Sequence, residues 1–246
     1  KRNNNLKIKL NMKQKKFFFT LAASMMLAAG FTSCGQVDSP VLPEPEPEPQ
    51  PLPEVVDDFD QGSLIKNGSC QGSLDANFWC HEWRTAEAQF DGNALIVEDP
   101  ADPTNRCAAV VCRSTEEAQA AGNMIADGDH IAGWDSQFFI TFGEDQALKA
   151  GDKIQLKMRV KADVEQSAVG TQCHNAPGGY IHWYCVGDVN FTTEWTDFVS
   201  NEIEVVEGAG WAQAAAGMYT IAFNLSNGQH NVFYFDDMQV IVTRAQ

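Results

Sequence analysis

Alternating apolar and polar residues mark the second half of the chain as rich in strands. In the run IQLKMRVK, residues 154–161, every second residue is apolar and the others are amide or basic. This period is typical of a strand with one buried face. Further runs are rich in β-branched and aromatic residues, as strands are: QFFITF, YIHWYC, MYTIAFNL and NVFYFDDMQVIV. Clusters of Gly, Asn, Asp and Pro separate these runs and predict turns.

Residues 114–121 form the one short segment with a helical pattern. From about residue 55 onward the composition is that of a single globular domain, long enough to bury a core. About nine or ten short strands with one short helix predict an all-β fold, a two-sheet β-sandwich.

The stretch TQCHNAPGGYIHWYC, residues 171–185, predicts a β-hairpin around the turn NAPGG. In that register His174 pairs with Tyr180, and Gln172 pairs with His182. Because side chains alternate between faces, one face carries planar and hydrogen-bonding groups: Gln172, His174, Tyr180, His182 and Tyr184. The other face is apolar and should point into the core: Val169, Cys173, Ile181, Trp183 and Cys185. We therefore expect the first face to look outward into an open groove.

That face has the chemistry of a sugar-binding surface. Sugar rings present apolar C–H patches that match aromatic rings, and their hydroxyls match Gln, His, Asn and Asp side chains. One alternative is a mixed face whose groups satisfy one another. A metal site built on the histidines is a second alternative, but Gln172 and Tyr180 are poor metal ligands.

The first 33 residues have the order of a secretory signal peptide. The basic segment KQKK, residues 13–16, follows Met12, the expected start, and precedes an apolar run from Phe17 to Phe31. This run is too short for a comfortable membrane span. The Cys34 that follows small residues resembles the lipobox cysteine of bacterial lipoproteins, which implies lipidation, although Phe31 stands where Leu is usual. The alternative is an ordinary signal peptide followed by a chance cysteine.

Residues 34–54 predict a lipid anchor and stalk ahead of the domain at 55–246. The run PVLPEPEPEPQPLP, residues 40–53, cannot build a core and favours extended polyproline II. A stalk of this length spans roughly 40 Å. We expect an exported protein anchored through its lipid in the outer membrane and facing the cell surface. A proline-motif ligand for a partner is the alternative reading of the run.

Charge narrows the classes of partner. Seven of the 17 Lys and Arg precede Cys34, whereas all 33 Asp and Glu follow it, so the part after Cys34 has 10 basic and 33 acidic side chains and a balance of −23. Nucleic acids and anionic lipid headgroups demand a basic face. The charge therefore excludes nucleic acid as a partner and fits a neutral ligand.

Cysteine usage fits an oxidising compartment. Besides Cys34 the chain has an even set of six: Cys70, Cys80, Cys107, Cys112, Cys173 and Cys185. An even set in an exported chain permits disulfides, and the sequence does not select their pairing. A bond between Cys107 and Cys112 is disfavoured, because both lie in one strand-like run and end on opposite faces.

Several segments resemble the carbohydrate-binding modules of families 4, 9 and 22, most strongly the copies associated with family 10 xylan-degrading enzymes. They are QCHNAPGGYIHWYCVGDVNFTTEWTDF, YTIAFNL, VFYFDDMQV and GWDSQFFITF. The resemblance covers residues 60–242 and is looser over 70–130. It implies a jelly-roll β-sandwich of the galactose-binding-like type that binds a β-linked polysaccharide, xylan first, in a concave cleft. By position, it implies ligand contacts from Gln172, His174, Tyr180, His182, Trp134 and Gln137.

Other aromatic and acidic residues extend this picture. Trp79 and Trp83, in the stretch FWCHEW with His81, are further candidates for a cleft wall, with a disulfide-pinned loop that caps the sandwich as the alternative. Trp195 falls on an apolar pattern and is expected in the core. The resemblance also implies a structural calcium ion between the first and last strands, with Asp58 and Asp236 as ligands. Acidic residues that are simply solvated are the alternative.

We predict a binding protein without catalysis. The alternatives are a jelly-roll glycoside hydrolase or polysaccharide lyase and a protein-binding adhesion domain. Glycoside hydrolysis needs two carboxylates across the scissile bond, and Glu82 and Glu194 are the best candidates. Nothing in the sequence brings those two together, and the chain has no G-x-S-x-G, Walker or H-E-x-x-H motif.

Overall fold

The structure, a computed structural model, describes residues 53–57, 59–61, 65–67, 77–81, 96–176, 178–179, 185–208 and 214–246. Contacts divide the chain into Lys1–Pro47 and Glu48–Gln246, and all described residues belong to the second unit. The predictions for Cys34, Asp58, Trp83, Tyr180 and His182 lie outside the described residues. The first strand begins at Pro53, two residues before the expected domain boundary.

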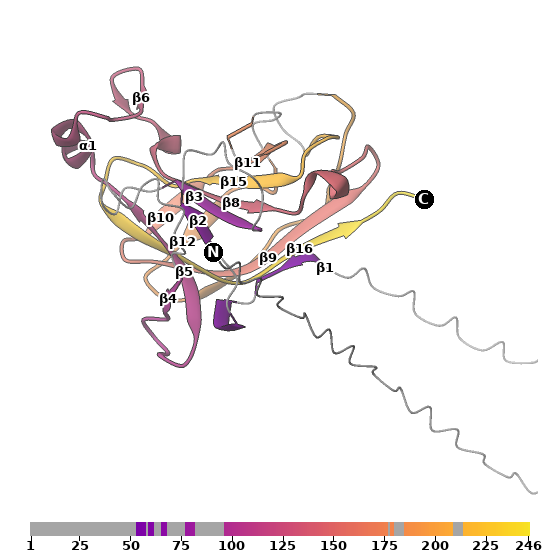
Figure 1. Cartoon of the computed structure of the whole chain (residues 1–246), viewed down its shortest axis with the longest axis horizontal. Helices are drawn as coiled ribbons and strands as arrows, with labels where there is room; N and C mark the ends of the chain where they lie inside the picture. The colour runs from indigo at the N-terminus through magenta and orange to yellow at the C-terminus, as the bar shows by residue number, and fades with distance from the viewer. Residues whose placement is uncertain are drawn as a thin grey trace, which may run out of the picture. The chain divides into compact units, whose positions relative to one another are not determined.

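Two sheets form the body of the domain, in two layers (Figure 1). The seven-stranded sheet consists of β13 (Thr196–Val199), β9 (Lys153–Ala162), β16 (Asn231–Thr243), β5 (Arg106–Cys112) and β4 (Ile96–Glu98), with β1 (Pro53–Val56) on β16 and β14 (Ile203–Glu204) on β9. The five-stranded sheet consists of β11 (Thr171–His174), β15 (Thr220–Asn224), β8 (Gln137–Thr141), β3 (Phe78–His81) and β2 (Ile65–Asn67). All pairs are antiparallel except β2 with β3.

From β8 onward the chain passes back and forth between the two layers. Strands β8, β11 and β15 belong to the five-stranded sheet, and β9, β13 and β16 to the seven-stranded sheet. This alternation is the connectivity of a jelly roll. The all-β sandwich with one short helix, predicted from the sequence, is confirmed for the described part of the chain.

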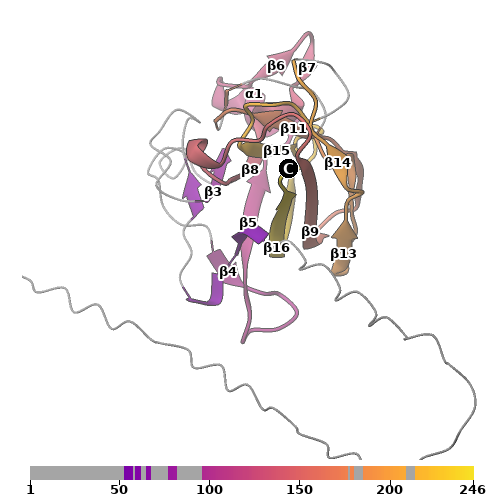
Figure 2. The same cartoon turned by 90° about the vertical axis from the view of Figure 1, so that its right-hand side faces the viewer.

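Smaller elements complete the domain. Two short sheets pair β10 (Gln166–Val169) with β12 (Val189–Phe191), and β6 (Ala126–Asp127) with β7 (His130–Ile131). The helical segments are α1 (Thr115–Ala121), η1 (Phe59–Gln61), η3 (Gly133–Asp135) and η4 (Glu144–Gln146). Figure 2 shows α1, β6 and β7 together at one end of the domain. No described helix is long and apolar enough to cross a membrane.

The core lies between the two sheets and follows the predicted alternation. In β9, residues 154, 156, 158 and 160 are buried, and the residues between them are half-buried. The ring of Phe138 on β8 stacks on Phe235 of β16 at 4.4 Å between centroids, and Phe191 meets Phe233 edge-on at 4.9 Å. These aromatic contacts join the layers because β8 and β16 belong to different sheets.

Helix α1 forms where the sequence has both a start signal and a stop signal for a helix. Ser114 accepts a hydrogen bond from the Glu117 amide, and the Glu117 carboxylate accepts one from the Ser114 amide, which together make a capping box;. Gly122 ends the helix with φ = 71°, a left-handed value that favours glycine;. The predicted helix at 114–121 is therefore confirmed, with Ser114 as its cap.

Strand β16 changes its neighbour halfway along. Residues 231–235 pair with β5 and residues 239–241 pair with β1, while β9 follows the other edge. A β-bulge separates the two halves, and Asp237 within it has φ = 49°. The bulge projects the adjacent carboxylates of Asp236 and Asp237 at this switch, since bulges re-aim side chains.

The described cysteines are all buried, and no disulfide joins any two of them. They are Cys80, Cys107, Cys112, Cys173 and Cys185. Cys112 belongs to the core cluster and Cys107 does not, so the expectation that these two lie on opposite faces of one strand is confirmed.

Candidate functional site

The five-stranded sheet has a second face that points away from the core between the sheets. Its first face carries Cys173, Ile221, Phe138 and Ile140, which belong to the core cluster. The alternate residues of the same strands lie on the second face, which we call the aromatic-polar face: Trp79, His81, Gln137, Phe139, Thr141, Gln172, His174, Thr220, Ala222 and Asn224.

Strand register arranges the aromatic-polar face in rows. Gln172, Ala222, Phe139 and Trp79 lie opposite one another across four strands. In this row Trp79, Phe139 and Ala222 form an apolar cluster separate from the main core. The middle of the face is thus aromatic, and Gln172 lies at the edge of the cluster.

Hydrogen-bonding groups flank the aromatic cluster on both sides. In one flanking row Asn224, Gln137 and His81 are neighbours, and Gln137 Nε2 donates to Asn224 Oδ1 at 2.7 Å. In the other, the His174 ring lies 5.9 Å from the Phe139 ring, and its Nε2 is 3.4 Å from Gln172 Oε1. These amides and imidazoles are of the same chemical types as the donors and acceptors predicted for sugar hydroxyls.

Burial keeps both imidazoles neutral. It lowers the pKa of His174 to about 4, against a smaller raising effect from a hydrogen bond with the Ala176 backbone. Burial is also the main cause that lowers the pKa of His81, partly offset by the nearby Asp135 carboxylate. At pH 7 each ring therefore has one N–H donor and one nitrogen acceptor.

The face assignment of Gln172 and His174 is confirmed, but the expected strand pairing is not the one described. These residues lie opposite Ala222 and Thr220 of β15, and Cys173 points the other way into the core. The predicted partners Tyr180 and His182 lie outside the described residues.

The expectation of an open groove at Gln172 and His174 is wrong. Their side chains are only 7% and 4% exposed, and Gln137 is 6% exposed. Trp79, Phe139 and Ala222 on the same face are also buried and form an apolar cluster of their own, so this face is packed like a second core layer instead of lining a groove. Greater access remains at Trp134 and Asn224, which are half-buried.

Trp134 is positioned by a buried ion pair. It lies in η3, whose next residue, Asp135, is fully buried and accepts two hydrogen bonds from Arg113, at 2.9 Å and 2.7 Å. Arg113 also donates to the side-chain and backbone oxygens of Asn123, and Asp135 accepts from the Ile125 amide. The network attaches the segment formed by residues 114–136 to the start of β8.

Sequence reasoning did not place Phe139 or Asn224 on this face, and it considered Trp79 and His81 only as part of the FWCHEW stretch, a candidate cleft wall. The alternation in QFFITF placed Gln137 and Phe139 on one side, which was a usable signal. Neither Trp79 nor Asn224 had such a signal, because their places follow from pairing with β8, and pairing between distant strands is not written in local pattern.

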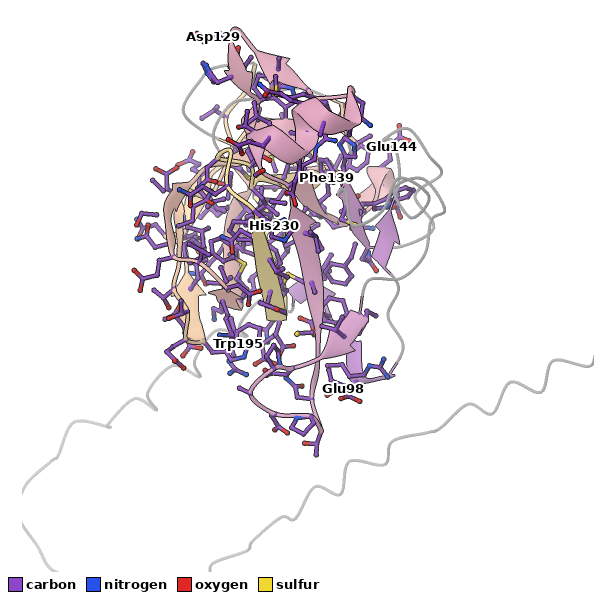
Figure 3. The ribbon with its side chains drawn as sticks, turned by 90° about the vertical axis from the view of Figure 1, so that its left-hand side faces the viewer. Glu98, Asp129, Phe139, Glu144, Trp195 and His230 are labelled. Carbon is purple, nitrogen blue, oxygen red and sulfur yellow. The ribbon has the colours of Figure 1, made fainter. Side chains whose placement is uncertain are left out.

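A second set of polar residues lines a pocket of about 360 Å³ next to the β16 bulge. We call it the acidic pocket, and its lining is Asp60, Asp99, Ala101, Asp102, Thr104, Asn105, Arg159, Trp195, Asp236 and Asp237. Trp195, expected in the core, is instead half-buried here, because its Nε1 donates to Asp99 Oδ1 at 2.9 Å. Figure 3 shows Trp195 and Asp129 at opposite ends of the domain.

The acidic pocket already contains its own hydrogen bonds and positive charge. Asn105 donates to Asp236 at 2.7 Å and to Asp99 at 3.3 Å, and the Arg159 guanidinium lies 3.8 Å from Asp236 and 3.5 Å from Asp237. Arg159 also covers the Trp195 ring at 4.9 Å. Burial raises the pKa of Asp236, although the Asn105 hydrogen bond opposes it.

These residues do not by themselves assemble the predicted calcium site. Among the described residues no group of three or more His, Cys, Asp or Glu side chains could hold a metal ion, and the charge nearest Asp236 is the guanidinium of Arg159. Because Asp58 lies outside the described residues, calcium binding stays a prediction. The carboxylate Glu194, considered for catalysis, is exposed, and Glu82 lies outside the described residues.

Comparison with known proteins finds weak structural likeness to carbohydrate-binding modules. No protein-family model and no curated protein sequence matches the chain. Among solved structures, the CBM22-1 xylan-binding domain from Paenibacillus barcinonensis is 8% identical, with a TM-score of 0.42 over 80% of this chain and 98% of that one. The N-terminal cellulose-binding domain of a Cellulomonas fimi β-1,4-glucanase is 13% identical, with a TM-score of 0.35 over 62% of this chain and 90% of that one.

A third similar structure is the family 11 carbohydrate-binding module of a Clostridium thermocellum cellulosomal cellulase. It is 14% identical, with a TM-score of 0.31 over 61% of this chain and 81% of that one. Identities and scores this low do not assign a ligand to this chain.

Proposed function

We propose that this protein binds a neutral β-linked polysaccharide, xylan first, without acting on it chemically. The observation that carries the proposal is the composition of the aromatic-polar face. An aromatic cluster of Trp79 and Phe139 is flanked by Gln137, Gln172, His81 and His174, and none of these groups carries a charge at neutral pH. The sequence resemblance to family 4, 9 and 22 modules supports the choice of xylan.

Binding would rest on matching surfaces rather than on ion pairs. Among the described residues, Trp134 would stack its ring on a C–H patch of the sugar and Asn224 would exchange hydrogen bonds with hydroxyls, because both are half-buried. Trp79, Phe139 and His174 are instead buried. Contact begins at the accessible end of the face, where Trp134 and Asn224 are half-buried. Each hydroxyl gives up bonds to water for bonds to protein with little net gain, so the affinity for one glycan chain should be modest.

Surface display would compensate for modest affinity. In the proposed arrangement Cys34 carries a lipid in the outer membrane, and the Pro-Glu stalk holds the domain away from the cell surface. Many copies on one membrane raise the effective concentration of sites along a long polymer. The protein would then retain glycan near enzymes and importers at the cell surface.

Affinity electrophoresis tests the proposal. The protein is run in native gels that contain xylan, mixed-linkage β-glucan, mannan or no polysaccharide, and we expect retardation in xylan. The double variant Trp134→Ala/Gln137→Ala should bind roughly tenfold more weakly or worse, because it loses one aromatic contact and one hydrogen-bonding group. A second double variant, Tyr180→Ala/His182→Ala, tests the predicted hairpin residues.

Gln155→Ala is the matched control. Gln155 is a strand glutamine of the other sheet, and it also makes one described hydrogen bond, at 3.0 Å to the Ser200 carbonyl. It should leave retardation unchanged. Equal mobility in all gels would refute glycan binding and favour a protein partner. Release of reducing sugars would instead favour a glycoside hydrolase.

A further inference from the structure

Two cysteine side chains meet inside the core. Cys173 on β11 and Cys185 in the segment before β12 are 0% and 3% exposed and belong to the same apolar cluster. Their thiols are joined by a hydrogen bond. The contact brings together two positions that flank residues 174–184, the segment that contains Tyr180 and His182.

Backbone hydrogen bonds fix this contact independently of the sulfur atoms. The Cys185 amide donates to the Thr171 carbonyl at 3.1 Å. The Thr171 hydroxyl accepts from the Val186 amide at 3.1 Å and donates to the Gly187 carbonyl at 2.6 Å. Since Thr171 and Cys173 belong to one strand paired with β15, the segment 185–187 is held against the strand that carries Cys173.

We propose that Cys173 and Cys185 form a disulfide bond when the protein folds in an oxidising compartment. The two thiols lose two protons and two electrons, and an S–S bond forms between their sulfurs. A disulfide of a thiol–disulfide oxidoreductase or of oxidised glutathione accepts the electrons and protons and becomes two thiols. This inference does not depend on glycan binding.

Burial sets the time at which the bond forms. Both sulfurs are out of reach of a large oxidant once the sheets have closed, so the exchange takes place during folding. The hydrogen bond with Cys173, and then burial, also raise the pKa of Cys185, and a thiol that stays protonated exchanges slowly. The folded protein should therefore neither form nor lose the bond readily.

The bond would constrain the segment that holds the predicted ligand residues Tyr180 and His182. A disulfide acts mainly by removing conformations from the unfolded chain, more for longer loops. Here the closed loop is residues 173–185. We expect the oxidised protein to have a melting temperature roughly 5–10 °C above that of the reduced protein.

Peptide mass spectrometry tests the pairing directly. The full chain is unfolded with reductant, refolded with mixed oxidised and reduced glutathione, alkylated while unfolded, and cut with a protease specific for Glu. Cleavage after Glu165 and Glu194 releases residues 166–194, in which Cys173 and Cys185 are the only cysteines. We expect this peptide to lack alkyl groups and to be two hydrogens lighter than its reduced form.

The contrary results are equally direct. Two alkyl groups on the peptide 166–194, or its linkage to a peptide that contains another cysteine, would overturn the proposal. Melting temperatures give a second readout. The difference between oxidised and reduced protein should disappear in Cys185→Ser and persist in Cys107→Ser, a buried cysteine of β5 outside this cluster. Persistence of that difference in Cys185→Ser would also refute the pair.

Discussion

His174 illustrates how position in the sheet determines the chemistry of a single side chain. Its ring is 4% exposed and lies beside Phe139 and Gln172. Burial disfavours the imidazolium, so the pKa in the folded protein is about 4 instead of 6.5. A neutral ring can both donate to and accept from a hydroxyl, whereas an imidazolium can only donate.

The low pKa of His174 predicts a loss of stability in acid. Between pH 6.5 and pH 4 the unfolded chain takes up a proton at this ring and the folded protein does not. The free energy of unfolding should therefore fall as the pH falls through this window, by up to about 3 kcal/mol from this group. Urea unfolding of His174→Asn at several pH values should show a shallower decline than the parent protein.

Carboxylates also titrate in this range, so the difference between parent and variant is the informative quantity. His130→Asn is the control for replacing a histidine that is not buried, because the His130 side chain is 72% exposed. An unchanged decline in His174→Asn would contradict the expected role of burial.

At the scale of single residues, the sequence predicted which face of a strand a side chain lies on better than it predicted how exposed that side chain is. Period-two alternation correctly separated Gln172 and His174 from Cys173, because it depends only on strand geometry. It could not show that Trp79 comes next to Phe139 on that face, or that both are buried there, since these two residues lie on strands far apart in sequence.

The segment between β5 and β8 is attached to the sheets by a buried polar contact. Residues 114–136 contain α1, β6, β7 and η3, and Arg113 and Asp135 close them at the base with two hydrogen bonds. Both side chains are almost fully buried, 6% and 0% exposed. Trp134 depends on this closure for its position beside the aromatic-polar face.

Removal of one partner should destabilise the domain strongly. Arg113→Met leaves the Asp135 carboxylate buried without its cation, and we expect a loss of about 3–5 kcal/mol in the free energy of unfolding. Denaturant unfolding measures this loss. Lys153→Met is the matched control, because its ion pair with Glu202 is half exposed at both ends and should contribute at most about 1 kcal/mol. Equal losses in the two variants would contradict the assignment.

At the scale of elements, local signals were sufficient where the interactions are local. The short helical pattern at 114–121 predicted α1, and alternation predicted β9. The pairing of β11 with β15 was not predictable, because a strand chooses its neighbour through the topology of the whole sheet. The turn NAPGG suggested that β11 pairs with the residues directly after that turn. The described partner of β11 is instead β15, at residues 220–223.

For the whole molecule, the count and spacing of strands were enough to predict a β-sandwich, since two sheets are the simplest way to bury so many alternating faces. The site was predictable only in part. Gln137, Gln172 and His174 do share a face, but the ligand, the lipid at Cys34 and the calcium ion depend on chemistry that the described residues do not contain.

Calcium binding would affect the whole domain, because the ion would lie between its first and last strands, with Asp58 and Asp236 as the expected ligands. If they share an ion, calcium should raise the melting temperature by several degrees and EDTA should lower it. Asp236→Asn should abolish the difference. A melting temperature that is the same in calcium and in EDTA would contradict the calcium site.

Strand β16 has a consequence for biosynthesis. It follows β1, β5 and β9 in the chain, yet it lies between them in the seven-stranded sheet. Those three strands cannot be joined into one sheet while β16 is still inside the ribosome. A nascent chain therefore cannot complete the seven-stranded sheet, or close the core between the sheets, until residue 243 has been released from the ribosome.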